Sequence, residues 1–184
     1  MIMKKDASSF EAFRKNIMRI MLLTVVLALI VPVTSYAQGK ANFSGSWALN
    51  ATKSDMGQQG QGQRMGGGMG SSFVAKQEAN LLTIESTRTN QNGETSTVTS
   101  KYTLDGKESV NTTPRGESKS TAKWSADGKT LTIVTTRTFD MNGESRTMTS
   151  TQVLSLTEGN TLTINSTATT PNGERKSKLV YDKK

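Results

Sequence analysis

The chain has 184 residues, carries 23 Lys and Arg against 15 Asp and Glu for a net charge of +8, and contains neither cysteine nor histidine. The absence of cysteine excludes disulfides, activated thiols and a lipid attached to cysteine. The absence of histidine removes the commonest general base and metal ligand, so we expect neither an enzyme nor a cofactor.

The segment 1–37 has the pattern of a secretory signal peptide. An apolar run, Ile20–Val31, follows several basic residues and ends at Pro32, and the small-x-small sequence Ser35-Tyr36-Ala37 comes next. We therefore predict cleavage before Gln38 and export of a soluble protein to the periplasm or beyond. The alternative is a transmembrane anchor, but a spanning helix needs ~20 apolar residues and this run is shorter.

The remaining segment, residues 38–184, is long enough for a single domain with one core. Loss of the signal peptide removes five basic and two acidic residues and lowers the net charge from +8 to +5. If translation starts at Met18, the signal peptide is shorter but the exported chain is the same. An exported basic protein can contact an anionic membrane or glycan surface, and we expect no nucleic-acid partner. The alternative is that the charge serves solubility alone, and no oligomeric state is predicted.

The exported segment is predicted to consist of strands and turns. A first strand covers Gly45–Asn50, and the Gly-, Gln- and Met-rich stretch Met56–Gly70 has no periodicity and is predicted to be a flexible loop, a flap over the barrel mouth. No later segment has a helical period, and Thr and Ser dominate where a helix would have Ala or Leu. The further strands are predicted at Phe73–Ala79, Leu81–Thr89, Glu94–Leu104, Glu117–Ser125, Thr130–Phe139, Glu144–Leu156, Thr161–Thr169 and Glu174–Tyr181.

One hairpin unit occurs three times. It reads LTIESTRTNQNGE from Leu82 to Glu94, LTIVTTRTFDMNGE from Leu131 to Glu144, and LTINSTATTPNGE from Leu162 to Glu174. Repeated hairpins predict an antiparallel meander that must close or stack to bury its apolar face. Because each strand carries few large apolar residues, a barrel with a partly polar interior is favoured over a sandwich. The predicted fold is an all-β, up-and-down barrel of about eight to ten strands.

Side-chain alternation predicts the register of the first hairpin. Leu82, Ile84 and Ser86 share one face of their strand, and Val98, Ser100 and Tyr102 share one face of the next. A turn at Gln91-Asn92-Gly93, with a bulge at the glycine, brings the two faces together. In the third copy the alternation does not show which side chains face inward, because Val180 is apolar and so are its alternating neighbours Leu179 and Tyr181. The register of this hairpin is therefore left open.

The string Asn42-Phe43-Ser44-Gly45-Ser46-Trp47 resembles the signature that opens the first strand of lipocalins. The wider stretch Phe43–Ser54 resembles small exported bacterial lipocalin-like proteins, which are calycin-type β-barrels. This resemblance implies an up-and-down barrel whose Trp closes the bottom and whose cup binds small apolar ligands. It also implies an Arg near the C-terminus that packs over the Trp, for which Arg175 is the candidate.

The function expected from these observations is non-catalytic binding of a small apolar or amphipathic molecule inside the barrel. Arg88 and Arg137 occupy the same position of the repeat, where they can form an anion clamp or, alternatively, lie solvated at the barrel rim. The two tryptophans can be ligand platforms or, as is more common, plugs at the end of the barrel. The candidate ligand-binding residues are Trp47, Arg88, Tyr102, Trp124, Arg137 and Met148.

Two other functions remain open at this stage. The first is a structural or surface-interaction protein of the cell envelope whose barrel is filled by its own side chains. The second is Cu(I) binding by the thioethers of Met56, Met65 and Met69 in the Gly-rich stretch. The string Ser120-Thr121-Ala122-Lys123 matches the S-x-x-K motif of serine β-lactamases, but that motif needs a helix, whereas this segment alternates as a strand.

Overall fold

The computed structural model describes residues 39–57, 69–89, 95–113, 116–141, 143–157, 160–170 and 173–184. The predicted signal peptide, the centre of the Gly-rich stretch and the tips of the three repeated hairpins lie outside these residues. Within them the chain forms β1 (Gly45–Leu49), β2 (Ser72–Gln77), β3 (Leu81–Thr89), β4 (Thr95–Thr103), β5 (Glu108–Thr113), β6 (Gly116–Trp124), β7 (Thr130–Met141), β8 (Glu144–Thr157), β9 (Thr161–Thr170) and β10 (Gly173–Lys183).

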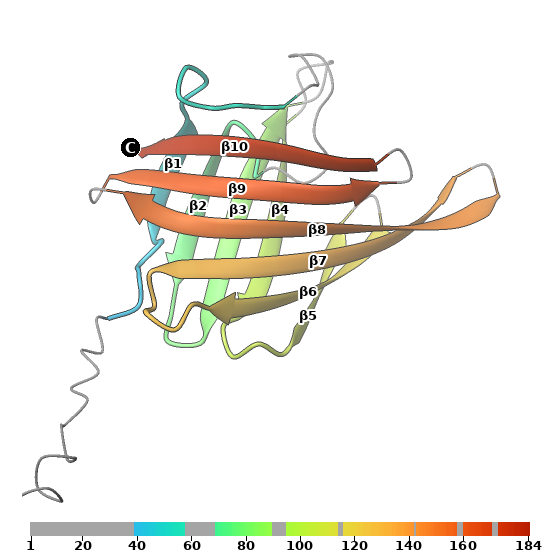
Figure 1. The fold of residues 1–184 in the computed structure, drawn as a ribbon, viewed down its shortest axis with the longest axis horizontal. Helices are drawn as coiled ribbons and strands as arrows, with labels where there is room; N and C mark the ends of the chain where they lie inside the picture. Colours follow the sequence, from blue (N-terminus) through green and yellow to red (C-terminus); the bar gives the residue numbers. More distant parts are fainter. Residues whose placement is uncertain are drawn as a thin grey trace, which may run out of the picture. The chain divides into compact units, whose positions relative to one another are not determined.

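The strands form one antiparallel sheet in the order β4-β3-β2-β1-β10-β9-β8-β7-β6-β5. Consecutive strands pair with one another except β4 and β5, and β1 also pairs with β10, so the meander curls into a nearly closed barrel. Figure 1 shows β1–β4 crossing behind β6–β10. The predicted all-β, up-and-down fold is confirmed. No helix among the described residues is long and apolar enough to cross a membrane.

β5 has no counterpart among the strands predicted from the sequence. It reads ESVNTT, and its one large apolar side chain, Val110, is 53% exposed. A strand this polar gives no alternation signal, because hydrophobic periodicity arises only where one face is buried in a core. All the strands that were predicted do occur, with ends that differ by a few residues from the predicted ones.

The register of the first hairpin is confirmed. Leu82 pairs with Tyr102, Ile84 with Ser100, and Ser86 with Val98, so the two predicted faces form one inner surface. The turn predicted at residues 91–93 lies outside the described part of the chain.

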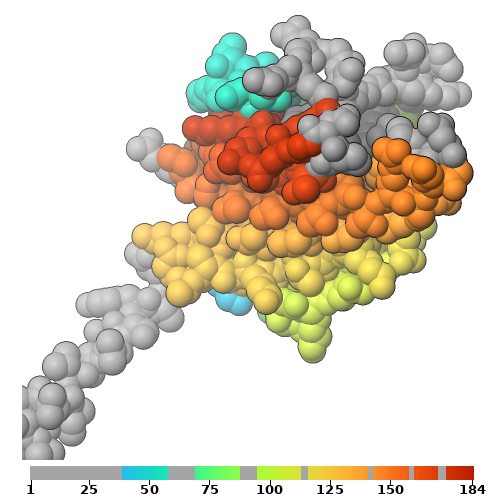
Figure 2. All heavy atoms as spheres, turned by 45° about the vertical axis from the view of Figure 1, so that its right-hand side comes forward, coloured from blue at the N-terminus to red at the C-terminus, as the bar shows by residue number. Residues whose placement is uncertain are grey.

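The ambiguous parity of the third hairpin also has an explanation. Leu179 pairs with Ile164 and Tyr181 with Leu162, which places this set inside the barrel. Val180 points outward but is only 5% exposed. The segment that follows β1 lies against it: the Asn50 N–H donates to the Val180 carbonyl (2.8 Å), and the Val180 N–H donates to Ser54 Oγ (2.9 Å). Figure 2 shows this segment, in teal, packed on the red of β10. Both faces of β10 are therefore buried here.

The repeated Leu-Thr-Ile runs build the core. In each copy the Leu and the Ile point inward, and all six of these side chains are at most 4% exposed. Burying one such side chain contributes about 1.5–3 kcal/mol. Tyr181 joins this core through an edge-to-face contact with Phe73, with ring centres 5.0 Å apart. The Tyr181 hydroxyl donates to the Gly70 carbonyl at 3.0 Å.

The barrel has one junction without a backbone ladder, between β4 and β5, which we call the β4–β5 seam. Side chains of β5 bridge it. The Lys101 N–H donates to Asn111 Oδ1 (2.7 Å), and Asn111 Nδ2 donates to the Lys101 carbonyl (2.9 Å). The Thr103 N–H donates to Ser109 Oγ at 2.9 Å. The Asn111 amide thus pairs with β4 as a neighbouring peptide group would, and satisfies backbone groups that the missing ladder leaves free.

We predict that Asn111→Ala destabilises the barrel by about 1–3 kcal/mol, because two backbone groups of Lys101 lose their partners. Urea denaturation measures the loss, and amide hydrogen exchange locates it at Lys101. Asn165→Ala is the control, since Asn165 is exposed on the outer face and its loss should change stability by less than ~0.5 kcal/mol. Equal stability of the two variants would contradict the role assigned to Asn111.

A second prediction concerns stability at high pH. Burial raises the pKa of Tyr181 to about 12, above its usual value of 10.0. The stability contributed by the neutral hydroxyl is therefore complete below pH 10 and is lost as the pH rises towards 12, because the unfolded chain ionises first. We expect Tyr181→Phe to show a smaller fall in unfolding free energy between pH 9 and pH 11.5 than the wild type. Parallel pH dependence in both proteins would contradict this.

Candidate functional site

One end of the barrel is closed by aromatic side chains, and we call it the Trp end. Trp47 is 1% exposed, and its Nε1 donates to the Phe43 carbonyl at 2.9 Å. The Phe43 ring stacks on Trp124 with ring centres 5.7 Å apart and an interplanar angle of 9°. Offset stacking of this kind adds about 0.5–1.5 kcal/mol to the burial of the rings.

The segment before β1 holds this closure in place. The Ala41 N–H donates to the Gly128 carbonyl in the β6–β7 turn (2.9 Å), and Gln77 Nε2 donates to the Ala41 carbonyl (2.9 Å). The Phe43 N–H donates to Gln77 Oε1 at 3.0 Å. The N-terminal segment therefore spans from β2 to the β6–β7 turn, in the manner of a strap.

A cation does lie over Trp47, but it is not the residue that the resemblance implied. Lys183 Nζ is 5.7 Å from the centre of the Trp47 ring, and Lys183 pairs directly with Trp47 in the β1–β10 ladder. Arg175 pairs with Ala168, eight residues earlier on β10, so the prediction for Arg175 was wrong. Lys183 at this position supplies the cation–π contact.

The inner surface becomes polar with distance from the Trp end. Ser120 Oγ lies 2.9 Å from Thr135 Oγ1, and Ser118 Oγ donates to the Asn111 carbonyl at 3.2 Å. On β6 these serines precede the inward Ala122 and Trp124, and on β7 the apolar Leu-Thr-Ile run is followed by threonines. The buried polar side chains, all at inward positions, are Ser86, Asn111, Ser118, Ser120, Gln152 and Ser177.

Arg137 and Tyr102 meet within this polar part. Arg137 is on the inner face of β7, and its Nε is buried without a hydrogen-bond partner among the described residues. Burial raises the pKa of the Tyr102 hydroxyl, while a hydrogen bond with Ser100 and the positive charge of Arg137 lower it. The two side chains are thus close enough to interact electrostatically. A fully solvated rim position, the alternative interpretation, does not fit a buried Nε.

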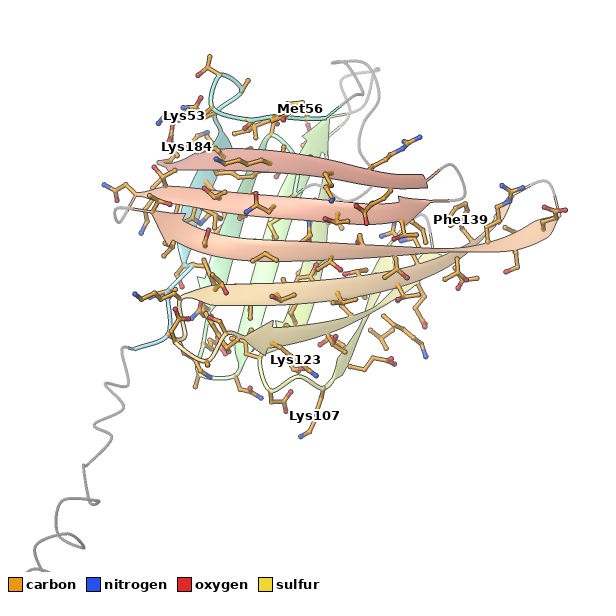
Figure 3. All side chains as sticks on the ribbon, viewed as in Figure 1. Lys53, Met56, Lys107, Lys123, Phe139 and Lys184 are labelled. Carbon is orange, nitrogen blue, oxygen red and sulfur yellow. The ribbon has the colours of Figure 1, made fainter. Side chains whose placement is uncertain are left out.

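Arg137 also marks the place where the barrel wall ends. It is the last β7 residue with a partner in β6, whereas β7 and β8 continue to pair as far as Met141 and Glu144. The projecting ribbon is visible in Figure 1, and Figure 3 labels Phe139 on it. Arg137 therefore lies at the boundary between barrel interior and ribbon.

The structure also places the other predicted ligand-binding residues, Met148 and Arg88. Met148 pairs with Arg137 on β8, and Arg88 is at an inward position opposite Ser96; the Arg88 side chain is outside the description. The structure brings Tyr102, Arg137 and Met148 towards one region, whereas both tryptophans belong to the closure of the Trp end. Ligand contacts of all six candidates remain predictions.

Arg175 is at an inward position of β10, which was not predicted from the sequence. It shares its face with Ser177, Leu179 and Tyr181. The alternation along β10 does not reveal this, because the apolar Val180 is buried on the outer face and so both faces of the strand carry buried apolar residues.

Trp124 Nε1 is the other buried donor without a partner in the described part of the chain. Trp124 pairs with Leu131, six residues before Arg137 on β7. At ~3.3 Å per residue the two positions are roughly 20 Å apart along the strand, too far to bind one small group together.

The methionines of the Gly-rich stretch are packed where they are described. Met69 is 7% exposed, and Met56 packs against the core. Figure 3 shows Met56 near β10. Met65 lies in the part of the predicted flap, residues 58–68, that is outside the described residues, so copper binding remains a prediction. No group of three or more Asp or Glu among the described residues could hold a metal ion.

The S-x-x-K string lies on β6, as its alternation predicted. Ser120 points into the barrel and is 2% exposed, whereas Lys123 is exposed on the outer face (Figure 3). A Ser and a Lys on opposite faces of a strand cannot act as nucleophile and base.

Comparisons with known proteins bear on the fold alone. No protein-family model matches the sequence. No curated protein matches it either. Among solved structures, a match is zebrafish ileal bile acid-binding protein complexed with cholic acid, at 19% identity and a TM-score of 0.50. The match covers 77% of this chain and 98% of that chain. The fold is therefore a calycin-like barrel of ten antiparallel strands.

We predict that Phe43→Ala opens the Trp end. Loss of a buried Phe should cost about 3–5 kcal/mol and shift the Trp fluorescence to longer wavelength, because Trp124 loses its stacking partner. Denaturation curves and emission spectra measure both effects. Phe139→Ala on the ribbon is the matched control and should change stability by about 1 kcal/mol or less. Similar losses in both variants would contradict the closure described above.

Proposed function

We propose that this protein is an exported, lipocalin-like, non-catalytic binding protein whose barrel takes up a small amphipathic molecule. The observation that carries the proposal is the division of the inner surface into an apolar part at the Trp end and a polar part that contains Arg137, whose buried Nε has no hydrogen-bond partner among the described residues. An amphipathic molecule has the same division. Removal of residues 1–37 and passage through a membrane belong to the proposal.

The width of the barrel supports it. The interior of an eight-strand barrel is just wide enough for its own side chains to fill, and the diameter grows with strand number. Here ten strands surround an interior whose middle is lined by serines, among them Ser86, Ser118, Ser120 and Ser177. The small size of these side chains supports an interior with room for a guest. The zebrafish protein of similar fold holds cholic acid, an amphipathic molecule, in its structure.

A self-filled structural barrel is the second candidate, and the Trp end favours it. Side chains below 2% exposure occupy that end, including Trp47, Tyr181 and Phe43. The two candidate functions therefore differ in whether the serine-lined part of the interior is open to a ligand or filled by side chains. The experiment must test that part.

The test is native mass spectrometry of the full chain produced in an exporting host, before and after solvent extraction. We expect a polypeptide that begins at Gln38 and carries a small mass that extraction removes. Ser120→Leu should abolish the bound mass by filling the interior, whereas Thr121→Leu, on the outer face, should keep it. Circular dichroism confirms that both variants fold. A bare polypeptide that takes up nothing from a lipid extract would refute binding and leave the structural barrel.

A further inference from the structure

An arginine with an unsatisfied buried N–H is costly unless something binds it. Leaving a buried charged donor without an acceptor costs more free energy than leaving a neutral donor without one. The inward positions around Arg137 are Ser118 on β6, Thr135 on β7, and Met148 and Ser150 on β8. None of these is acidic. Of the two acids on the same hairpin, Glu144 is ion-paired with Arg146 at 3.1 Å, and Asp140 is on the opposite face of β7 from Arg137. The described protein therefore supplies no carboxylate to Arg137.

A row of paired residues leads from Arg137 on β7 to the β4–β5 seam. Arg137 pairs with Ser118, Ser118 pairs with Asn111, and the Asn111 amide binds Lys101 across the seam. These residues form one row across β7, β6, β5 and β4. Tyr102 sits between Lys101 and Thr103, whose N–H groups both donate across the seam. A group bound to both Arg137 and Tyr102 would therefore link the two sides of this junction.

We propose that an acidic head group, a carboxylate or a group of similar shape and charge, binds between Arg137 and Tyr102 and ties β4 to β7 across the β4–β5 seam. The ligand class is then an anionic amphipath. This inference rests on the proposed function and specifies its ligand. The guanidinium supplies a charged donor and the phenol a second hydrogen bond, a combination that holds an anion more strongly than neutral donors do.

Binding to this site makes a specific prediction about the seam. In the free protein, side chains alone hold β4 against β5, so the amides of Lys101 and Thr103 should exchange faster than those within ladders. A bound acid adds a second link beside that of Asn111. It should slow exchange at these two amides more than at β7–β8 ladder amides.

The affinity experiment compares dodecanoate with dodecanol, which share a chain and differ in charge. Isothermal titration of the extracted protein should show dodecanoate binding roughly tenfold or more tightly, as a charge-assisted hydrogen bond implies. Arg137→Gln should remove this preference and leave dodecanol binding unchanged. Lys119→Gln is the matched control: it removes one positive charge from the outer face of the neighbouring strand β6 and should keep the preference.

A second variant guards against misfolding. Tyr102→Phe retains the ring and loses only the hydroxyl, so it should lower the affinity for dodecanoate but not for dodecanol. Hydrogen exchange with each probe gives an independent readout, since only dodecanoate should protect Lys101 and Thr103.

The outcomes separate the two proposals. Equal affinity of the wild type for both probes, or an unchanged preference in Arg137→Gln and Tyr102→Phe, overturns the acidic site and leaves the binding function intact. Failure of both probes to bind, together with a bare polypeptide in native mass spectrometry, overturns the binding function as well.

Discussion

The alternation of side chains along paired strands is the constraint from which the interior of this barrel follows. Because successive residues point to opposite faces and each ladder fixes the register, a residue's row in the barrel is determined by its place in the repeat. The Leu-Thr-Ile opening of each repeat becomes the apolar core, and the Thr/Ser continuation becomes the polar interior. A shift of one residue in a single ladder would move its leucines to solvent. Burial of the core thus maintains the polar row that ends at Arg137.

The β4–β5 seam shows what happens where that constraint is relaxed. A polar strand such as β5 contributes little to the core, and β4 and β5 share no backbone ladder. Asn111 compensates by presenting a side-chain amide whose donor and acceptor match those of a peptide. The junction without a backbone ladder lies in the same row as Arg137, whose Nε has no hydrogen-bond partner among the described residues. Wall stability and ligand recognition are coupled at this point, because the same strands supply both.

The features of the fold and the site that could be predicted from the sequence are those whose residues belong to the repeat or to the apolar alternation of a strand. The repeats located most strands, and the parity of Leu82 and Tyr102 gave a correct register, because both follow from hydrophobic alternation. β5 was not predicted because ESVNTT has no apolar face. Arg175 was assigned to the Trp end from the lipocalin resemblance, whereas the ladder of β1 with β10 places Lys183 there. Arg137 could be proposed as an anion ligand from its repeat position. Its electrostatic interaction with Tyr102 on β4 could not, since that proximity arises from closure of the sheet.

Closure also has a consequence for how the chain is made. Every ladder joins neighbours in sequence except that of β1 with β10, in which Trp47 meets Lys183. The barrel therefore cannot close until the last residues have been synthesised. Non-local pairing of this kind is slow, because loop-closure entropy must be overcome before the contact forms. Until β10 is made, β1 lacks one of its two partner strands, so the junction that holds the Trp47–Lys183 contact is the last part of the wall that can form during synthesis.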